Sequence, residues 1–585
     1  MLGLIPLEFK QVYPEKKVRD PEGELAARMR ALCRVETIRY CVHLNLFLFD
    51  FEKPRLELEQ QQVLLRMFFD KIELDRLNML GIGISRSGLA LPTFFHRAQL
   101  LELIRYATWY CSDSDCHRTP VANKKSKEKF TEAALLASEI AMNKLESSQD
   151  FEGENSEKKP EKLLRSLRLA GQFGWPMIEP ERAFGRGKII FSDYLPNEFP
   201  DFHKEFEAHT KLTLEEYFSC LFMMLPYYSG IPIAAGSHNR HLIRPTLMYE
   251  EIPHMTNVLA RYLELESQSI DELRNALWEN GENAGHYSLR SIRERPILRL
   301  KEDEAMIIDP ILYIEKAMIS PLFMLSKNLA EKDILGHFGD AFEKYARDIL
   351  GKICQQSSSD LRFGDELKIQ GDQICDACII EDNILCLFEM KAVWVRDDQI
   401  ANPDHTKYLS ALRNKYGKNA NATFQLARAV NRLTSGDWSL KDHDIRSIKR
   451  IYPILVAYDP LLNLPGHFGF FASEFRTILE PDTMLKNSKT IMTKSQWEIA
   501  PTAIITIDIL EDLEASVKNF KLSDLLRDYF AYCDTYFRDI DDDLSLQEFI
   551  KRNYETKMDR HGSVTNRAME TFEVLMKAIV PTLSN

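Results

Sequence analysis

The stretch ICDACIIEDNILCLFEMKAVWV, residues 374–395, decides the fold of the C-terminal half of this chain. It is mostly apolar and strand-like, and Asp382-Asn383 in its middle tolerates the positive φ of a tight hairpin turn. Three charged side chains interrupt the apolar run, namely Asp376, Glu389 and Lys391. The sequence therefore predicts a buried hairpin that carries charges where Val or Ile would be more stable.

The turn also predicts how the charged residues meet. Counting outward from it pairs Glu381 with Ile384 and places Asp376 opposite Glu389, with Cβ atoms about 5 Å apart. Since side chains alternate between the two faces of a strand, Asp376, Glu389 and Lys391 share one face. Two facing carboxylates repel in a buried strand pair unless a cation lies between them.

A divalent ion held by carboxylate oxygens is the cation that this pattern favours. Lys391 then lies about one residue pair from the ion, where an ammonium orients a water molecule or holds a phosphate oxygen. The ion and the low dielectric are both expected to lower the pKa of Lys391. The pattern therefore predicts metal-assisted attack on a phosphodiester.

The segments around the hairpin predict a mixed α/β region. After about residue 330 the hydrophobic pattern changes from one helix after another to strands with interposed helices. We expect helices at 338–353 and 423–433, and strands within 362–369, 373–381 and 384–395 and at 451–459 and 502–510. This order predicts a central mixed sheet covered by helices.

Asp376 followed by Glu389-Met390-Lys391 resembles the PD-(D/E)xK nuclease superfamily, which has the restriction-endonuclease-like fold. The order helix, three strands, helix, strand agrees with that fold, and the resemblance runs from residue 338 to between 460 and 515. One departure is Cys375, where the superfamily motif has Pro. The resemblance implies a Mg²⁺-dependent nuclease, with Mn²⁺ as a substitute, whose ion is bound by Asp376, Glu389 and the backbone carbonyl of Met390.

The same resemblance points to two further site residues. Glu343, in FGDAFEKY, matches a Glu that the first core helix of the superfamily often carries, and it is implied as a catalytic residue and third metal ligand. A solvated residue at the edge of the apolar helix face is the alternative for Glu343. Gln425 matches a Gln that some branches carry on the helix after the ExK strand.

A basic surface is predicted beside this site. Residues 391–450 contain 12 Lys and Arg against 6 Asp and Glu, in a chain whose net charge is −13. Gln425, Arg428 and Arg432 fall on one helical face, which suits a row of phosphate-facing donors. Lys415 and Lys418 extend the predicted nucleic-acid-binding rim, for which a normally charged surface is the alternative.

Residues 1–330 read as largely helical, with the possibility of two subdomains. Apolar residues at three- and four-residue spacing predict helices at 22–49, 56–72, 98–111 and 128–146, and Thr213 with Glu216 forms a capping box. The charged segments 123–129 and 147–162 are expected to be exposed loops. We therefore predict a helical region at 1–330 for regulation, recognition or oligomerisation, a nuclease-like domain at 331–515 and a helical extension at 516–585.

Composition sets the broad class of protein. A hydrophobic fraction of 45% and a charged fraction of 28% are typical of a globular protein. Ten scattered cysteines favour reduced thiols in a cytoplasm, and Cys375 and Cys378 are expected in the core because they fall on opposite strand faces. The longest uncharged stretch, 217–239, predicts a buried helix and a loop, so we expect no membrane span.

Together these patterns favour a cytoplasmic Mg²⁺-dependent nuclease, with DNA as the favoured substrate and a role in phage defence or restriction. The helical N-terminal region is expected to bind a partner protein or a second copy of the chain. The alternative is a non-catalytic nucleic-acid-binding or scaffold protein with a nuclease-like fold.

Overall fold

The structure is a computed structural model of the 585-residue chain. It describes all residues except 1–4, 49–57, 80–91, 114–119, 122, 147–178, 226–240, 279–288, 327–328, 330–331, 367, 370–371, 396, 401–404, 418–421, 437–444, 465, 480–481, 486–487, 489, 517–520, 537–544, 555–561 and 580–585.

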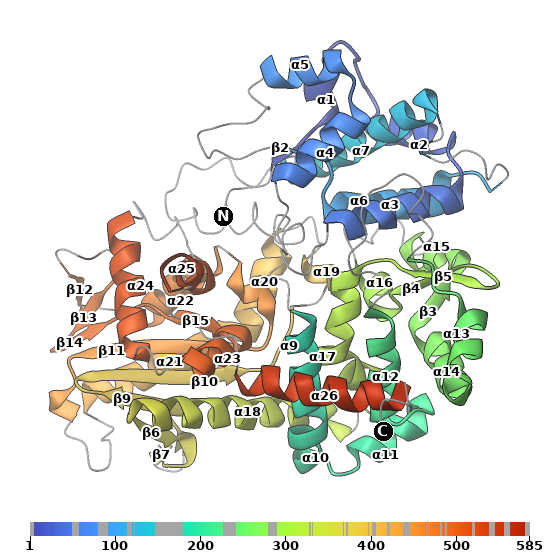
Figure 1. The fold of residues 1–585 in the computed structure, drawn as a ribbon. Helices are drawn as coiled ribbons and strands as arrows, with labels where there is room; N and C mark the ends of the chain where they lie inside the picture. The colour runs from blue at the N-terminus through green and yellow to red at the C-terminus, as the bar shows by residue number, and fades with distance from the viewer. Residues whose placement is uncertain are drawn as a thin grey trace.

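A mixed eight-stranded sheet forms the centre of the C-terminal half, as expected (Figure 1). Seven of its strands follow one path: β12 (Thr483–Met484), β13 (Met492–Lys494), β14 (Trp497–Ile499), β11 (Arg450–Ala457), β10 (Ile384–Lys391), β9 (Ala377–Glu381) and β6 (Asp360–Phe363). The eighth, β15 (Ala503–Thr506), pairs with β11 in parallel. Strand β10 pairs with β11 in parallel and with β9 in antiparallel fashion, so the two kinds of pairing meet at β10.

The elements around β10 occur in the predicted order. Helix α18 (Ile334–Ser357) comes first, then β6, β9 and β10, then α21 (Ala422–Ser435) and β11. A small hairpin of β7 (Lys368–Ile369) and β8 (Asp372–Gln373) lies between β6 and β9. The strand expected at 502–510 is wrong in its second half, because the chain changes from β15 to helix α23 (Ile507–Ser516) at Thr506.

Helices cover both faces of the β9–β10 hairpin. Ala377, Ile379, Cys386 and Phe388 belong to the large hydrophobic core that includes the apolar side of α18. Cys378, Ile380, Leu385 and Leu387 pack with the apolar side of α21. Strand alternation therefore places α18 and α21 over opposite faces of the hairpin.

The N-terminal half is mostly helical, as predicted. Its helices are α1 (Phe9–Val12), α2 (Pro21–Met29), α3 (Arg34–Leu48), α4 (Leu58–Phe68), α5 (Lys71–Met79), α6 (Arg97–Tyr110), α7 (Lys124–Glu146), α9 (Pro180–Ile189), η2 (Ile190–Tyr194), α10 (Leu195–Glu198), α11 (Phe202–Thr210), α12 (Leu214–Met223), α13 (Pro245–Glu251), η4 (Pro253–Met255), α14 (Thr256–Glu266), α15 (Ile270–Trp278), α16 (Arg290–Glu294) and α17 (Pro310–Ser326). The capping box at the start of α12 is confirmed, because the Thr213 hydroxyl accepts from the Glu216 amide and the Glu216 carboxylate from the Thr213 amide.

Three expectations for this half need correction or lie outside the described residues. The single helix expected at 22–49 is two helices, α2 and α3, with a break between them. The basic segment 123–129 is not a loop, because α7 begins at Lys124 and its lysines occupy the first turns of that helix. The segment 147–162 lies outside the described residues.

Short strands in this half were not predicted. A three-stranded sheet contains β3 (Ser267–Ser269), β4 (Ile297–Lys301) and β5 (Glu304–Ile307), and β1 (Ile5–Pro6) pairs with β2 (Pro92–Thr93). Strands of two to five residues show too few alternations to be distinguished from loops in a sequence.

The remaining elements complete the C-terminal half. They are η6 (Gly364–Glu366), α19 (Asp397–Ile400), α20 (His405–Tyr416), η7 (Ile445–Ser447), η8 (Pro460–Asn463), α22 (His467–Leu479), α24 (Leu522–Tyr536), α25 (Leu546–Asn553) and α26 (Ser563–Ile579). The last three confirm the expected helical extension. Helix α26 lies against α9 of the N-terminal half (Figure 1), so closely that a Cβ on Gly185 would be 2.4 Å from the Val564 carbonyl oxygen.

A buried ionic cluster also joins the two halves of the chain. Arg186 on α9 is 1% exposed, and its guanidinium lies 2.5 Å from Asp508 and 2.6 Å from Glu511, both on α23. The Tyr345 hydroxyl on α18 donates to Glu511 at 2.8 Å. Described apolar residues on both sides of residue 330 belong to one core cluster. Among the described helices, none is both long and apolar enough to cross a membrane.

Candidate active site

The predicted hairpin is confirmed, and its register is confirmed from the turn to the pair Ala377–Phe388. The expected pair of Asp376 with Glu389 is not part of the ladder, because the Asp376 amide donates to the Phe388 carbonyl instead. Strands β9 and β10 join through Asp382-Asn383, and Asp382 has a φ of 55° in the left-handed region. Glu381 pairs with Ile384, and the ladder continues to the pair Ala377–Phe388. The two-residue turn thus determines which side chains of each strand face α21.

The ladder becomes irregular at Asp376, which lies just before β9. Continuing the regular register would pair Asp376 with Glu389. The Asp376 amide donates instead to the carbonyl of the preceding residue, Phe388, at 3.0 Å. The side chain replaces the missing backbone acceptor, because Oδ2 accepts from the Met390 amide at 2.6 Å. Oδ1 accepts from Gln373 Nε2 at 2.9 Å. These bonds fix the Asp376 carboxylate against the backbone between Glu389 and Lys391.

By alternation along β10, Glu389 and Lys391 continue the row of Leu385 and Leu387 toward the end of the strand, where the charge of Glu343 on α18 also acts on both of them. Glu389 is 1% exposed, and its Oε1 accepts from Lys391 Nζ at 2.6 Å. Burial raises the pKa of Glu389, the Asp376 charge raises it further, and Lys391 opposes both effects. Burial likewise raises the pKa of Asp376. Burial thus raises the cost of charging both carboxylates, and the Asp376 charge adds to that cost at Glu389, as the sequence predicts.

In the structure the pKa of Lys391 is raised, whereas we expected burial and a bound ion to lower it. Burial lowers the pKa, but the nearby charges of Glu389 and Asp376 outweigh burial, and the net shift is upward. The expectation included the field of a divalent ion, whereas in the structure the ammonium itself compensates the carboxylates.

Glu343 lies on α18 and does not join Asp376 and Glu389 in a ready-made ligand set. Its carboxylate forms an ion pair with Arg347 one turn later, and its side chain is 29% exposed. Burial and the Asp376 charge raise the pKa of Glu343 above its usual value. In the part of the chain that the structure describes, no three His, Cys, Asp or Glu side chains are arranged to bind a metal ion. Glu343 would have to leave Arg347 to become the third ligand.

The residues expected on α21 occupy the face away from the sheet or its edge. Gln425 is half-buried, and its Oε1 atom is buried with no hydrogen-bond partner among the described residues. Arg428 is exposed and Arg432 half-buried, whereas Leu426 and Val430 pack against the sheet. A buried amide oxygen without a hydrogen-bond partner is a candidate acceptor for a bound water or ligand.

The rest of the predicted basic rim is described in part. Lys415 is half-buried on α20, and its charge lowers the pKa of Asp459 at the end of β11, although burial raises that pKa more. Lys418 lies outside the described residues. The expectation that Cys375 and Cys378 are core residues is confirmed, since both are buried free thiols.

No family model, curated protein or solved structure that was compared with the chain matches it.

The side chains present fit a hard divalent ion. Magnesium is usually bound by one or two carboxylates, with water and substrate phosphate oxygens completing its coordination. Asp376 and Glu389 supply two buried carboxylates. The charge of Asp376 raises the pKa of Glu389, and the ammonium of Lys391 interacts with both carboxylates. With the backbone carbonyl of Met390, this donor set contains oxygen atoms alone.

Arg347 is the charged residue near the site that the sequence analysis missed. It lies four residues after Glu343 on α18, and its charge lowers the pKa of both Glu343 and Asp376. The i, i+4 spacing of a Glu and an Arg was the available signal, but such pairs are common on ordinary helix surfaces.

Proposed function

We propose that the chain is a metal-dependent nuclease that hydrolyses phosphodiester bonds, with Mg²⁺ as the ion, Mn²⁺ as a substitute and DNA as the favoured substrate. The observation that carries the proposal is the pair of buried carboxylates, Asp376 and Glu389, with the half-buried ammonium of Lys391 beside them at the end of the hairpin. A fold gains no stability from placing two carboxylates there, which favours a functional reason for them.

Each residue has a distinct role in this proposal. Asp376, Glu389 and the Met390 carbonyl would hold the ion, which supplies Lewis-acid stabilisation of the phosphate charge. The Lys391 ammonium would orient the attacking water or hold a phosphate oxygen. Water oxygen attacks phosphorus, the bond from phosphorus to the leaving oxygen breaks, and the products are a phosphate monoester and a hydroxyl group.

The surrounding residues would bind the substrate. Arg428 and Arg432 on α21 donate to phosphates that flank the cleaved bond, and Lys415 with Lys418 extends this contact. Gln425 offers an amide oxygen for a water or a substrate donor. Glu343 would act as a catalytic residue and as a further ligand of the ion, once its carboxylate leaves the ion pair with Arg347. Restriction or phage defence, in a cytoplasm, is the setting that the resemblance suggests, with the helical half binding a partner or a second copy.

Cleavage assays test the proposal directly. The full chain is incubated with Mg²⁺ or Mn²⁺ and with single- and double-stranded DNA and RNA, alongside a chelator control and the Asp376→Ala variant. We expect cleavage that requires the metal and Asp376. Tight binding without cleavage of any substrate would instead support a non-catalytic nucleic-acid-binding protein, and absence of both would support a scaffold.

A further inference from the structure

Arg347 is held at the edge of the candidate active site by two different contacts. Its guanidinium pairs with the Glu343 carboxylate and lies 5.5 Å from the centre of the Phe363 ring on β6. The side chain is only 18% exposed. Its Nε atom is buried and has no hydrogen-bond partner among the described residues. A guanidinium has five N–H donors in a rigid plane, so these contacts leave part of its donor capacity for a ligand.

The Phe363 contact places Arg347 beside Asp376. Phe363 pairs with Ala377 in the β6–β9 ladder, and the amide of the next residue, Gly364, donates to the Asp376 carbonyl at 2.8 Å. The side chain of Asp376 accepts in turn from the Met390 amide, between Glu389 and Lys391. Arg347 therefore lies close to the strand ends that carry the candidate active site.

The charges of the site then suggest a use for this second cation. Asp376, Glu389 and Glu343 contribute three negative charges when ionised, and Lys391 and Arg347 contribute two positive charges. A divalent ion changes the sum from −1 to +1, which balances the single negative charge of a phosphodiester. Without Arg347 the loaded site would be neutral and would attract the substrate less strongly.

We propose that Arg347 is a catalytic residue that binds the phosphate of the cleaved phosphodiester. The inference rests on the proposed function. When Glu343 turns to the ion, its partner guanidinium keeps the Phe363 contact and presents its N–H edge to a non-bridging phosphate oxygen. Arginine suits this role because its planar fork matches phosphate geometry and its charge does not titrate. The proposal commits to phosphate as the ligand of Arg347.

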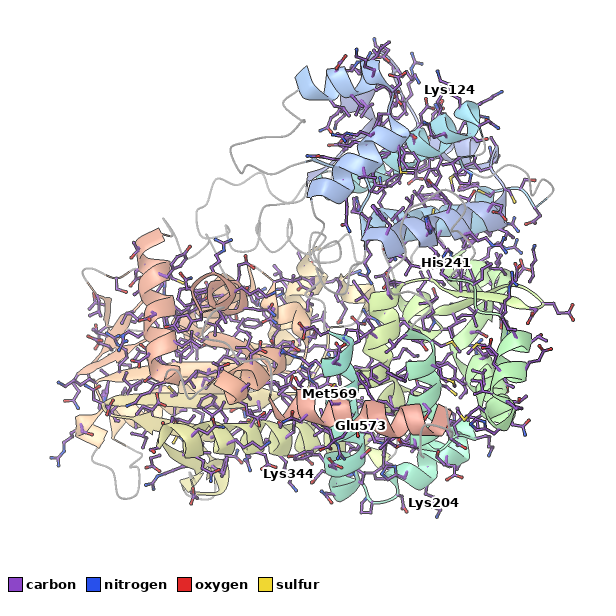
Figure 2. All side chains as sticks on the ribbon, in the orientation of Figure 1. Lys124, Lys204, His241, Lys344, Met569 and Glu573 are labelled. Atoms are coloured by element: carbon purple, nitrogen blue, oxygen red, sulfur yellow. The ribbon has the colours of Figure 1, made fainter. Side chains whose placement is uncertain are left out.

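A neighbouring lysine provides a matched control. Lys344, labelled in Figure 2, precedes Tyr345 on the same helix. Its side chain is 57% exposed and pairs with Glu198 at 2.5 Å. Its removal also takes one positive charge and one ion pair from α18. An effect of Arg347→Ala that Lys344→Ala does not reproduce therefore cannot come from net charge or helix pairing alone.

The experiment compares wild type, Arg347→Ala, Arg347→Lys and Lys344→Ala in three measurements. We expect Arg347→Ala to lower kcat/KM by about 100-fold and to reduce the slope of DNA affinity against salt by about 0.9. Binding is measured with Ca²⁺ under conditions that give no cleavage. Arg347→Lys should restore the slope but little of the rate, because an ammonium keeps the charge and loses the fork. Lys344→Ala should match wild type in both.

The third measurement, Mn²⁺ affinity by calorimetry, separates binding of phosphate from support of the metal site. Arg347→Ala should keep or increase Mn²⁺ affinity, because a positive charge beside the carboxylates is removed. The inference would be overturned if Arg347→Ala and Lys344→Ala had the same kcat/KM and salt slope, or if Arg347→Ala lost Mn²⁺ binding. In either case, metal-dependent cleavage by wild type would still support the proposed function. Absence of Asp376-dependent cleavage in wild type would overturn both.

Discussion

Replacement of Lys391 by Ala is the sharpest test of the candidate active site. Lys391 Nζ lies 2.6 Å from Glu389 Oε1, and the carboxylate is almost fully buried. With charge centres about 4 Å apart and an effective dielectric constant of about 20, the attraction between the two charges is about 4 kcal/mol. A cation of this strength, aimed at water or developing phosphate charge, commonly contributes about 3 kcal/mol to catalysis.

We therefore expect Lys391→Ala to lower kcat by about 100-fold or more, since each 1.36 kcal/mol corresponds to tenfold in rate. The fold should survive, because Glu389 already has a raised pKa and takes up a proton when the ammonium is lost. Metal binding should survive as well, because the ammonium is not a ligand and competes with the ion for Glu389.

The assay measures cleavage and Mn²⁺ binding across a range of metal concentrations for Lys391→Ala and Asp376→Ala. Asp376→Ala would remove a ligand, so raised Mg²⁺ should restore part of its activity, whereas the kcat of Lys391→Ala should stay about 100-fold or more below wild type at every concentration. Circular dichroism checks that both variants are folded. Turnover near the wild-type value in Lys391→Ala would refute catalysis through this group of residues.

Three further predictions concern the surface and the core. The double variant Arg428→Ala, Arg432→Ala should reduce the slope of DNA affinity against salt by about 1.8, at about 0.9 for each lost phosphate contact; an unchanged slope in a fluorescence anisotropy titration would show that the row is ordinary surface. Arg186→Met should lower the free energy of unfolding by about 3–5 kcal/mol in urea titrations, because it leaves buried Asp508 and Glu511 uncompensated, and a loss under 1 kcal/mol would contradict this. Burial lowers the pKa of His467 from 6.5 to about 4. Since the unfolded chain therefore binds the proton first, the free energy of unfolding should fall by about 3 kcal/mol as pH falls from 6.5 to 4. His467→Gln should flatten this part of the curve of stability against pH, and an unchanged pH dependence in the variant would contradict the prediction.

Local patterns were sufficient to predict the hairpin and the helices around it. The two-residue turn at Asp382 and the alternation along β10 determine the register, and helices α18 and α21 show clear apolar periodicity. The end of β15 was missed because TAIITIDIL is apolar almost throughout, and such a run shows neither strand nor helix periodicity.

The parts of the candidate site that depend on distant residues could not be predicted in this way. The slip at Asp376 follows from its side-chain bond to the Met390 amide, which replaces a regular ladder bond. The pKa of Glu343 depends on the charges of Asp376 and Lys391, which are distant in the sequence, as well as on Arg347 of its own helix. The contact of Arg186 with α23 joins residues more than 300 positions apart, and sequence spacing carries no signal for such a pair.

The ionic cluster around Arg186 has a consequence for any attempt to isolate the sheet-containing half of the chain. A fragment that begins at residue 331 would lack α9, and Asp508 and Glu511 would then face water or each other without their guanidinium. Tyr345 lies two positions from Glu343 on α18, and it would lose the environment that orients its hydrogen bond to Glu511. Truncation between the halves would thus disturb the helix that carries Glu343 and Arg347, and inactivity of such a fragment would reveal nothing about the chemistry of the intact chain.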